Sequence, residues 1–148
     1  MINSNYCLTS KEFMEAKAIL RAAKQFGFIE KDSFEAMEER CLALNKENCE
    51  KKAKGELVYG VVEYSFAAYL QYELTQFKLD FLSGKAKNYT YGQITQGDKI
   101  EFYNQNQDLF TNFFYEKYDF DLVEEVIEKR IREEEFYGYI KDILCQLS

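Results

Sequence analysis

Apolar residues recur every three or four positions along most of the chain, which is the period of a helix with one buried face. Cap signals divide this pattern into separate helices. Thr9 followed by Glu12 is typical of a capping box, and Gly27 and Gly55 are typical helix stops. The pattern predicts five helices, at Ser10 to Phe26, Ser33 to Lys54, Ser65 to about Ser83, Thr95 to about Phe110 and Asp121 to Ser148.

Residues 56–64 break the helical period. Their sequence, ELVYGVVEY, is rich in β-branched and aromatic residues around a central glycine, Gly60. Such a stretch favours an extended segment or a minor β-hairpin, but it is too short to build a sheet by itself.

The predicted fold is therefore mostly α, in a single domain over residues 1–148. The last predicted helix carries one broad apolar face that water would penalise. We expect this helix to pack back on the N-terminal helices, and a homodimer through the same face is the competing arrangement. The face consists of Val123, Ile127, Ile131, Ile140, Leu144 and Leu147.

Composition narrows the classes of partner. The 148 residues carry a formal charge of −7, which is opposite to the basic footprint of a nucleic-acid or anionic-membrane binder. No apolar run approaches the length of a membrane-spanning helix, and residues 1–10 lack the features of a secretory signal. These features favour a cytoplasmic protein, and an exported protein whose signal has been removed is the alternative.

Catalytic and metal-binding chemistry is poorly represented. The chain has no histidine, and Cys7, Cys41, Cys49 and Cys145 lack zinc-site spacing. It also lacks glycine-rich phosphate-binding motifs. We therefore expect no enzyme activity, no cofactor and no metal.

The strongest remaining signal is aromatic, since the chain has 12 Tyr and 13 Phe. Tyrosine and phenylalanine at partly exposed positions offer the apolar contact area that protein interfaces use. Most of these rings are expected in the core, but the third helix has more than one face can bury. The candidate peptide-binding residues are Tyr64, Tyr69, Tyr72, Phe77, Phe102, Tyr103, Phe113 and Phe114.

Three segments resemble the helical module of SurA/PrsA-type chaperones. The sequence ITQGDKIEFYNQNQDLF (residues 94–110) resembles the segment that precedes the isomerase domain of that family. Residues 119–144 resemble its closing helix, and residues 55–74 resemble small Gram-positive members. Only residues 111–118 stand where an isomerase domain would be inserted.

The resemblance implies a chaperone-like holding module that binds exposed apolar segments of unfolded or extended polypeptide clients, without isomerase catalysis. It also implies that the closing helix returns to the N-terminal helices. A helical adaptor or oligomerisation protein with one specific protein partner is the alternative function.

Overall fold

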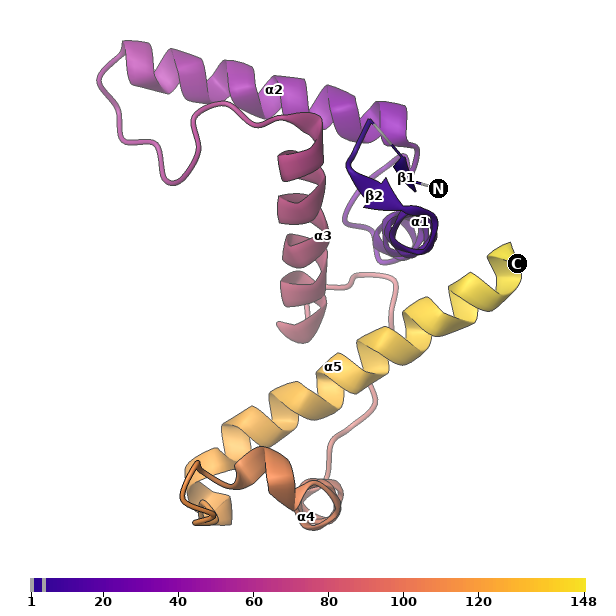
Figure 1. Cartoon of the computed structure of the whole chain (residues 1–148), viewed down its shortest axis with the longest axis vertical. Coiled ribbons are helices and arrows are strands. Elements are labelled where there is room, and N and C mark those ends of the chain that lie inside the picture. Colours follow the sequence, from indigo (N-terminus) through magenta and orange to yellow (C-terminus); the bar gives the residue numbers. More distant parts are fainter. Residues whose placement is uncertain (1, 4) are drawn as a thin grey trace.

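The computed structural model describes residues 2–3 and 5–148 and is almost entirely helical (Figure 1). Its described part contains five α-helices, so the prediction of a mostly α fold is confirmed. The elements are β1 (Ile2–Asn3), β2 (Leu8–Thr9), α1 (Ser10–Gln25), α2 (Phe34–Ala53), α3 (Phe66–Leu82), α4 (Gln96–Gln105), the 3-10 helix η1 (Gln107–Phe110) and α5 (Phe120–Leu147).

Side-chain caps explain where four of the helices begin. At α1, Thr9 Oγ1 accepts from the Glu12 backbone N–H at 3.2 Å and Glu12 Oε2 accepts from the Thr9 N–H at 2.8 Å. The same reciprocal pair starts α4 with Thr95 and Asp98. Single serine caps start α2 and α3. These contacts satisfy backbone donors that the first turn of a helix leaves free.

Residues 56–64, for which the sequence predicts an extended segment or at most a minor β-hairpin, form a loop without strands. Its backbone groups find a side chain in place of a second strand. Asn45 Oδ1 accepts from the Tyr64 N–H at 2.7 Å, and Asn45 Nδ2 donates to the Tyr64 carbonyl at 2.9 Å. The short antiparallel pair of the described chain is β1–β2, next to the start of α1.

Three hydrophobic cores lie one after another along the molecule. The first joins α1, α2 and the first half of α3 around Leu20, Met37 and Leu70. The second joins α1, the end of α3 and the second half of α5 around Phe26, Phe81 and Phe136. The third is small and joins α4, η1 and the first half of α5; it consists of Phe102, Phe110 and Ile127 with partly buried neighbours.

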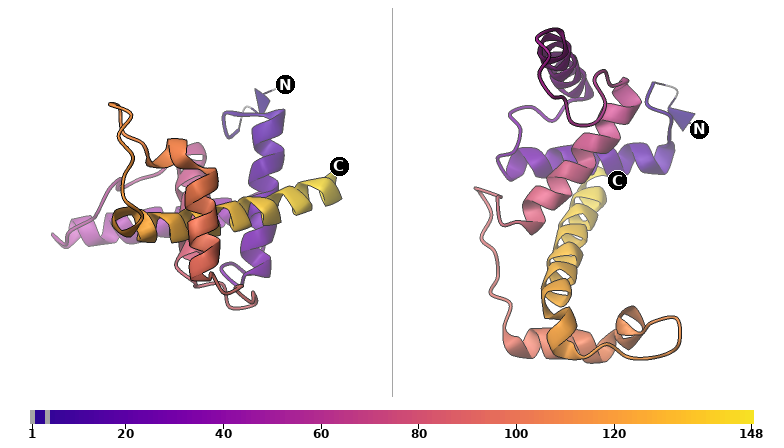
Figure 2. Two further views of the ribbon diagram at one scale, coloured as in Figure 1. Left: turned by 90° about the horizontal axis from the view of Figure 1, so that it is seen from below. Right: turned by 90° about the vertical axis from the view of Figure 1, so that its left-hand side faces the viewer.

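Helix α5 belongs to both the second and the third core. Ile127 is fully buried in the third, and Ile140 and Ile143 are buried in the second. The helix contacts α1, α3 and α4, which confirms that the C-terminal helix packs back on the N-terminal part of the chain. Figures 1 and 2 show α5 crossing the molecule, with α4 and η1 lying at its N-terminal end.

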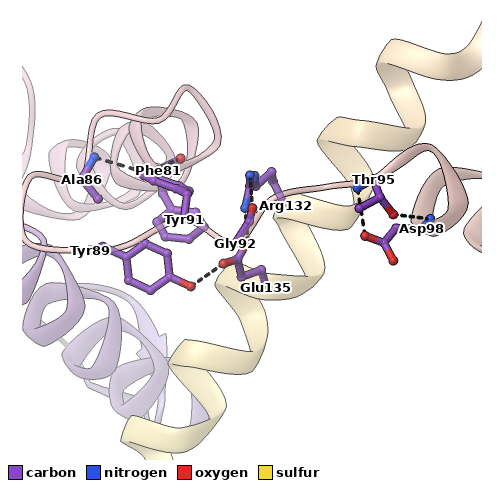
Figure 3. A network of polar contacts seen from close by, with 9 residues as sticks. All are labelled: Phe81, Ala86, Tyr89, Tyr91, Gly92, Thr95, Asp98, Arg132 and Glu135. Carbon is purple, nitrogen blue, oxygen red and sulfur yellow. Dashed lines mark hydrogen bonds and ion pairs between the residues drawn. The ribbon is translucent and has the colours of Figure 1, made fainter.

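The segment between α3 and α4 is held against α5 by a polar network (Figure 3). We call residues 83–95 the strap. Tyr89 donates its hydroxyl to Glu135, and Arg132 donates to Glu135 at 2.8 Å and to the Gly92 carbonyl at 2.6 Å. Tyr91 donates to the Phe81 carbonyl at 2.7 Å. The strap thereby fixes the position of α4 relative to α3.

Among the helices of the described residues, none combines the length and the apolar composition that crossing a bilayer requires.

Candidate functional site

The most exposed aromatic side chains of the molecule lie in the connection between η1 and α5. We call residues 111–118 the aromatic loop. Phe113, Phe114 and Tyr115 occupy its tip with 91%, 76% and 92% of their surface exposed. Three consecutive large rings thus face solvent at one place, which makes the aromatic loop the candidate interaction surface among the described residues.

The backbone of the aromatic loop is a tight hairpin rather than an irregular connection. Thr111 and Lys117 form an antiparallel bridge. The Asn112 N–H donates to the Glu116 carbonyl at 2.8 Å, and the Tyr118 N–H donates to the Phe110 carbonyl at 2.7 Å. These bonds bring the two ends of the loop together and project its tip away from the helices.

The Asn112 side chain organises the tip. Its Oδ1 accepts from the backbone N–H groups of Phe114 at 2.9 Å and Glu116 at 3.0 Å, and its Nδ2 donates to Glu116 Oε2 at 3.2 Å. Asparagine favours turns because its amide can replace a backbone partner in this way. The aromatic residues are consequently held by hydrogen bonds that do not involve their own side chains.

Tyr115 has a φ of +63°, in the left-handed region that residues with a side chain rarely adopt. Such strain persists where surrounding contacts hold the backbone in place. Here the ring is exposed, so burial offers no compensation within the protein. Backbone strain of this kind is a recognised feature of binding sites.

The base of the aromatic loop rests on the third core. The Tyr103 hydroxyl donates to the Tyr118 carbonyl at 2.6 Å, and the Lys117 ammonium lies 4.5 Å from the centre of the Tyr103 ring. The Tyr103 ring in turn packs against those of Phe110, in a tilted arrangement, and Phe120, edge to face. A helix pair therefore supports the loop, and the tip is presented from a fixed platform.

A second exposed apolar segment lies in the loop after α2. Leu57, Tyr59 and Val61 are 70%, 86% and 51% exposed. Asn48 Nδ2 donates to the Val61 carbonyl at 3.4 Å, and the Asn45 contacts described above hold the end of the loop. In Figure 1 this loop and the aromatic loop lie on the same side of α3, at opposite ends of the molecule.

The predicted binding residues divide into three groups. Tyr69, Phe77 and Phe102 are core residues with less than 9% exposure, so they do not belong to a binding surface. They were misassigned because an aromatic residue on a helix gives no sequence signal of which face its neighbours cover. Two of the predicted residues, Phe113 and Phe114, lie at the tip of the aromatic loop.

The other predicted residues have packing roles. Tyr64 and Tyr103 are half-buried. Tyr72 is 46% exposed but its ring packs 5.5 Å from that of Tyr64. The sequence interpretation missed Tyr115, whose signal was its place beside two phenylalanines in a segment without helical period.

The described residues offer little for catalysis. No three His, Cys, Asp or Glu side chains among them are grouped to hold a metal ion. A hollow of about 690 Å³ lies between residues 27–31 and α2 and contains Glu30, Glu39 and Arg40. Both carboxylates are exposed to solvent, and Arg40 binds Glu73 through two hydrogen bonds.

The polar groups of the network in Figure 3 are bonded to one another. Burial, reinforced by the hydrogen bond to Glu135, raises the pKa of Tyr89 to about 12, so its hydroxyl stays protonated. Glu135 is shared between Tyr89 and Arg132, which leaves it engaged on both oxygens. This cluster holds the strap and offers no group to a substrate.

Comparison with known proteins shows a similarity of fold to solved structures. No family model and no curated protein matches the chain. Two crystal structures of the GH136 lacto-N-biosidase from Eubacterium ramulus, the native protein and a selenomethionine derivative, match it with TM-scores of 0.71 and 0.73 at 22% identity. The matches cover 89% and 90% of this chain but 27% of the glycosidase chain.

The resemblance to SurA/PrsA-type chaperones is wrong as a family assignment, because the structural match is to part of a glycoside hydrolase. Capping boxes and aromatic spacing, on which that resemblance rested, describe amphipathic helices of many unrelated proteins. The chain therefore has the helical fold of a segment that makes up about a quarter of a larger glycosidase.

Proposed function

We propose that this chain is a non-catalytic helical module that binds one folded protein partner through its aromatic loop. The observation that carries the proposal is the tip itself. Phe113, Phe114 and Tyr115 are exposed together on a loop that backbone and Asn112 hydrogen bonds hold in one conformation. Exposed rings on a preorganised loop give large contact area at small entropic cost.

The rigidity of the loop favours one specific partner over a range of unfolded clients. Promiscuous binding surfaces generally rely on flexible, methionine-rich or mobile segments that can repack. The chain has three methionines, and Met37 is fully buried in the first core. Between the two functions expected from the sequence, the adaptor therefore has the stronger support.

The structural match supports the same proposal. In the glycosidase from Eubacterium ramulus this fold accounts for 27% of the chain, so there it accompanies a much larger remainder. We accordingly propose that the partner is a large folded protein of the carbohydrate-active class. A glycosidase requires a pair of carboxylates that flank the scissile bond, one of them kept protonated by its surroundings. The carboxylates of the hollow beside α2 are exposed to solvent, so we propose that the chain contributes binding and not hydrolysis.

The test is capture of the partner from lysate of the source organism by the immobilised chain. We expect one protein at fixed stoichiometry, and we expect it to be lost with the Phe113→Ser/Phe114→Ser variant. The matched control is Leu57→Ser/Tyr59→Ser, which removes exposed apolar surface of similar size at the other end of the molecule. Many proteins captured at low stoichiometry and equally by both variants would contradict the proposal and favour the holding function.

Absence of catalysis is tested separately. We expect the purified chain to release no disaccharide from a lacto-N-biosidase substrate, alone and at high protein concentration. Hydrolysis that survives repurification and is lost on Glu39→Gln would show that the hollow beside α2 is an active site.

A further inference from the structure

The net charge of the chain is concentrated at the end that carries the aromatic loop. The whole sequence has 26 acidic and 19 basic residues. Residues 95–128 contain nine of the acidic and two of the basic ones, so the rest of the chain carries 17 of each and is neutral. This segment comprises α4, η1, the aromatic loop and the first turns of α5, which lie together in Figure 1.

The two basic residues of this end are already engaged. Lys99, whose side chain is 16% exposed, lies between Glu124 at 3.3 Å and Glu128 at 3.6 Å. Lys117 lies over the ring of Tyr103. Seven acidic residues remain that are exposed and form no ion pair in the described part of the chain, namely Asp98, Glu101, Asp108, Glu116, Asp119, Asp121 and Glu125.

The exposed apolar surface of this end extends beyond the tip of the loop. Leu109 on η1 is 49% exposed and Leu122 in the first turn of α5 is 75% exposed. Leu109 and Leu122 thus add exposed apolar side chains on the two elements that flank the aromatic loop, and exposed carboxylates lie on the same elements. We call this combination the acidic aromatic end.

We propose that the acidic aromatic end docks onto an apolar surface of the partner that is bordered by arginine and lysine side chains. This rests on the proposed function and specifies the chemistry of its partner. A cationic border pairs with the unneutralised carboxylates, while the apolar surface contacts the rings of Phe113, Phe114 and Tyr115. Complementary charge of this kind accelerates association and rejects surfaces of the same sign.

The same charge distribution argues against two other occupants. A second copy of this chain would bring an equal negative charge against the first, which disfavours a homodimer through this end. An anionic membrane or a nucleic acid would be repelled for the same reason. The aromatic tip is therefore protected from self-association until a cationic surface reaches it.

The test uses two synthetic amphipathic helical peptides with identical apolar faces, one flanked by arginine and the other by glutamate. Amide chemical shifts of the isotopically labelled full chain are followed on titration. We expect the arginine peptide to shift residues 109–122 and to bind on the order of tenfold more weakly when salt rises from about 50 mM to about 500 mM. The glutamate peptide is expected to leave these amides unchanged.

Three double variants locate the effect. Asp108→Asn/Glu125→Gln removes two exposed charges of the acidic aromatic end, and we expect it to weaken binding of the arginine peptide severalfold. Glu50→Gln/Glu56→Gln removes two exposed charges near the end of α2 and should leave binding unchanged. Phe113→Ser/Phe114→Ser should weaken binding without changing its salt dependence.

Equal binding of both peptides, binding insensitive to salt, or shifts confined to residues outside 95–128 would each overturn the inference. The outcome is separable from that of the proposed function. A lysate partner that is lost with the ring variant but retained in full by Asp108→Asn/Glu125→Gln at every salt concentration overturns the charge inference alone. Failure to find any partner dependent on the rings overturns both.

Discussion

Tyr115 combines two features that a stable protein ordinarily avoids, a left-handed backbone and an exposed ring. For a residue with a side chain the left-handed conformation costs roughly 1–2 kcal/mol. The ring makes no compensating core contact, since 92% of its surface is exposed. A glycine at this position would therefore favour stability, whereas the proposed binding function requires the exposed ring.

Replacing Tyr115 with glycine separates these demands. We expect Tyr115→Gly to leave the free energy of unfolding unchanged or raise it by up to about 1 kcal/mol, because glycine adopts a φ of +63° without strain. Partner capture should fall markedly. Urea unfolding and capture are the measurements, and Phe113→Ser, which is expected to change stability by less than about 0.5 kcal/mol, is the control. A large loss of stability in Tyr115→Gly would indicate that the ring supports the fold.

The Arg40–Glu73 pair joins α2 to α3 in a partly buried place. Arg40 donates to Glu73 at 3.0 Å and 2.6 Å, and its side chain is 27% exposed while that of Glu73 is 7% exposed. The two residues therefore differ in what happens when the partner is lost. An unpaired Arg40 can still reach water, but an unpaired Glu73 stays buried.

We expect Arg40→Met to lower the free energy of unfolding by about 3 kcal/mol, because it leaves a buried carboxylate without its partner. Glu73→Leu should cost less, and the double variant should cost less than Arg40→Met. Chemical denaturation of the three variants forms the cycle. A larger loss of unfolding free energy in Glu73→Leu than in Arg40→Met would show that Arg40, rather than Glu73, is the group that cannot be hydrated.

At the scale of single elements, helix starts were more predictable than helix ends or loop structure. Thr9, Ser33, Ser65 and Thr95 cap their helices through contacts within three residues, so these starts leave a local signal in the sequence. The end of α4 was not predicted, because one helix was expected over residues 95–110 and the structure divides it into α4 and η1. The extended loop at residues 56–64 depends on Asn45, which is 19 residues away from Tyr64. Contacts at that separation leave no periodic signal.

The candidate site was predictable to a similar degree. Phe113 and Phe114 lie in residues 111–118, which show no helical period. The sequence therefore contains no pattern that would predict burial of these two rings. Phe77 and Phe102 were misassigned because their burial is set by α1, α2 and α5, whose positions depend on the fold. Exposure of a ring is thus predictable in a connector and unpredictable on a crowded helix.

The strap makes stability sensitive to alkaline pH. Burial, with the Glu135 hydrogen bond, raises the pKa of Tyr89 to about 12, and burial raises that of Tyr6 to about 12 as well. A tyrosine of the unfolded chain ionises near pH 10, so above ~10 the unfolded state releases its protons first and is favoured. The stability contribution is complete below that pH and is lost as pH rises toward 12.

We expect the urea midpoint of the native protein to fall between about pH 10 and about pH 12, and to fall less in Tyr89→Phe. At neutral pH that variant should lose about 1 kcal/mol, because one hydrogen bond from the strap to α5 is removed. An unchanged alkaline slope in Tyr89→Phe would mean that other tyrosines account for the effect.

At the scale of the whole molecule, three cores in series raise the question of how many units unfold. The prediction of a single domain remains to be tested. The first and second cores share α1 and α3, whereas the third is joined to them by α5 and the strap. We therefore expect the third core to respond separately to mutation.

Two isoleucines of α5 test this expectation, since both are buried but lie in different cores. Each change to alanine should lower the free energy of unfolding of the core that contains the isoleucine by about 2–5 kcal/mol. Ile140→Ala should lower the main thermal transition, while Ile127→Ala should produce an additional earlier transition with loss of helix signal. Calorimetry and circular dichroism are the measurements, and a single shared transition in both variants would show that the three cores unfold as one.

The membership of α5 in two cores also determines where the backbone can open. A helix of 28 residues whose two halves are held by different cores can fray from its first turns while its last turns stay intact. Amide protons of α4 and the first half of α5 should then exchange with deuterium faster than those of α1 and α3. A partner seated on the acidic aromatic end would slow exchange there, so the occupied and empty states should differ in the protection of this end alone.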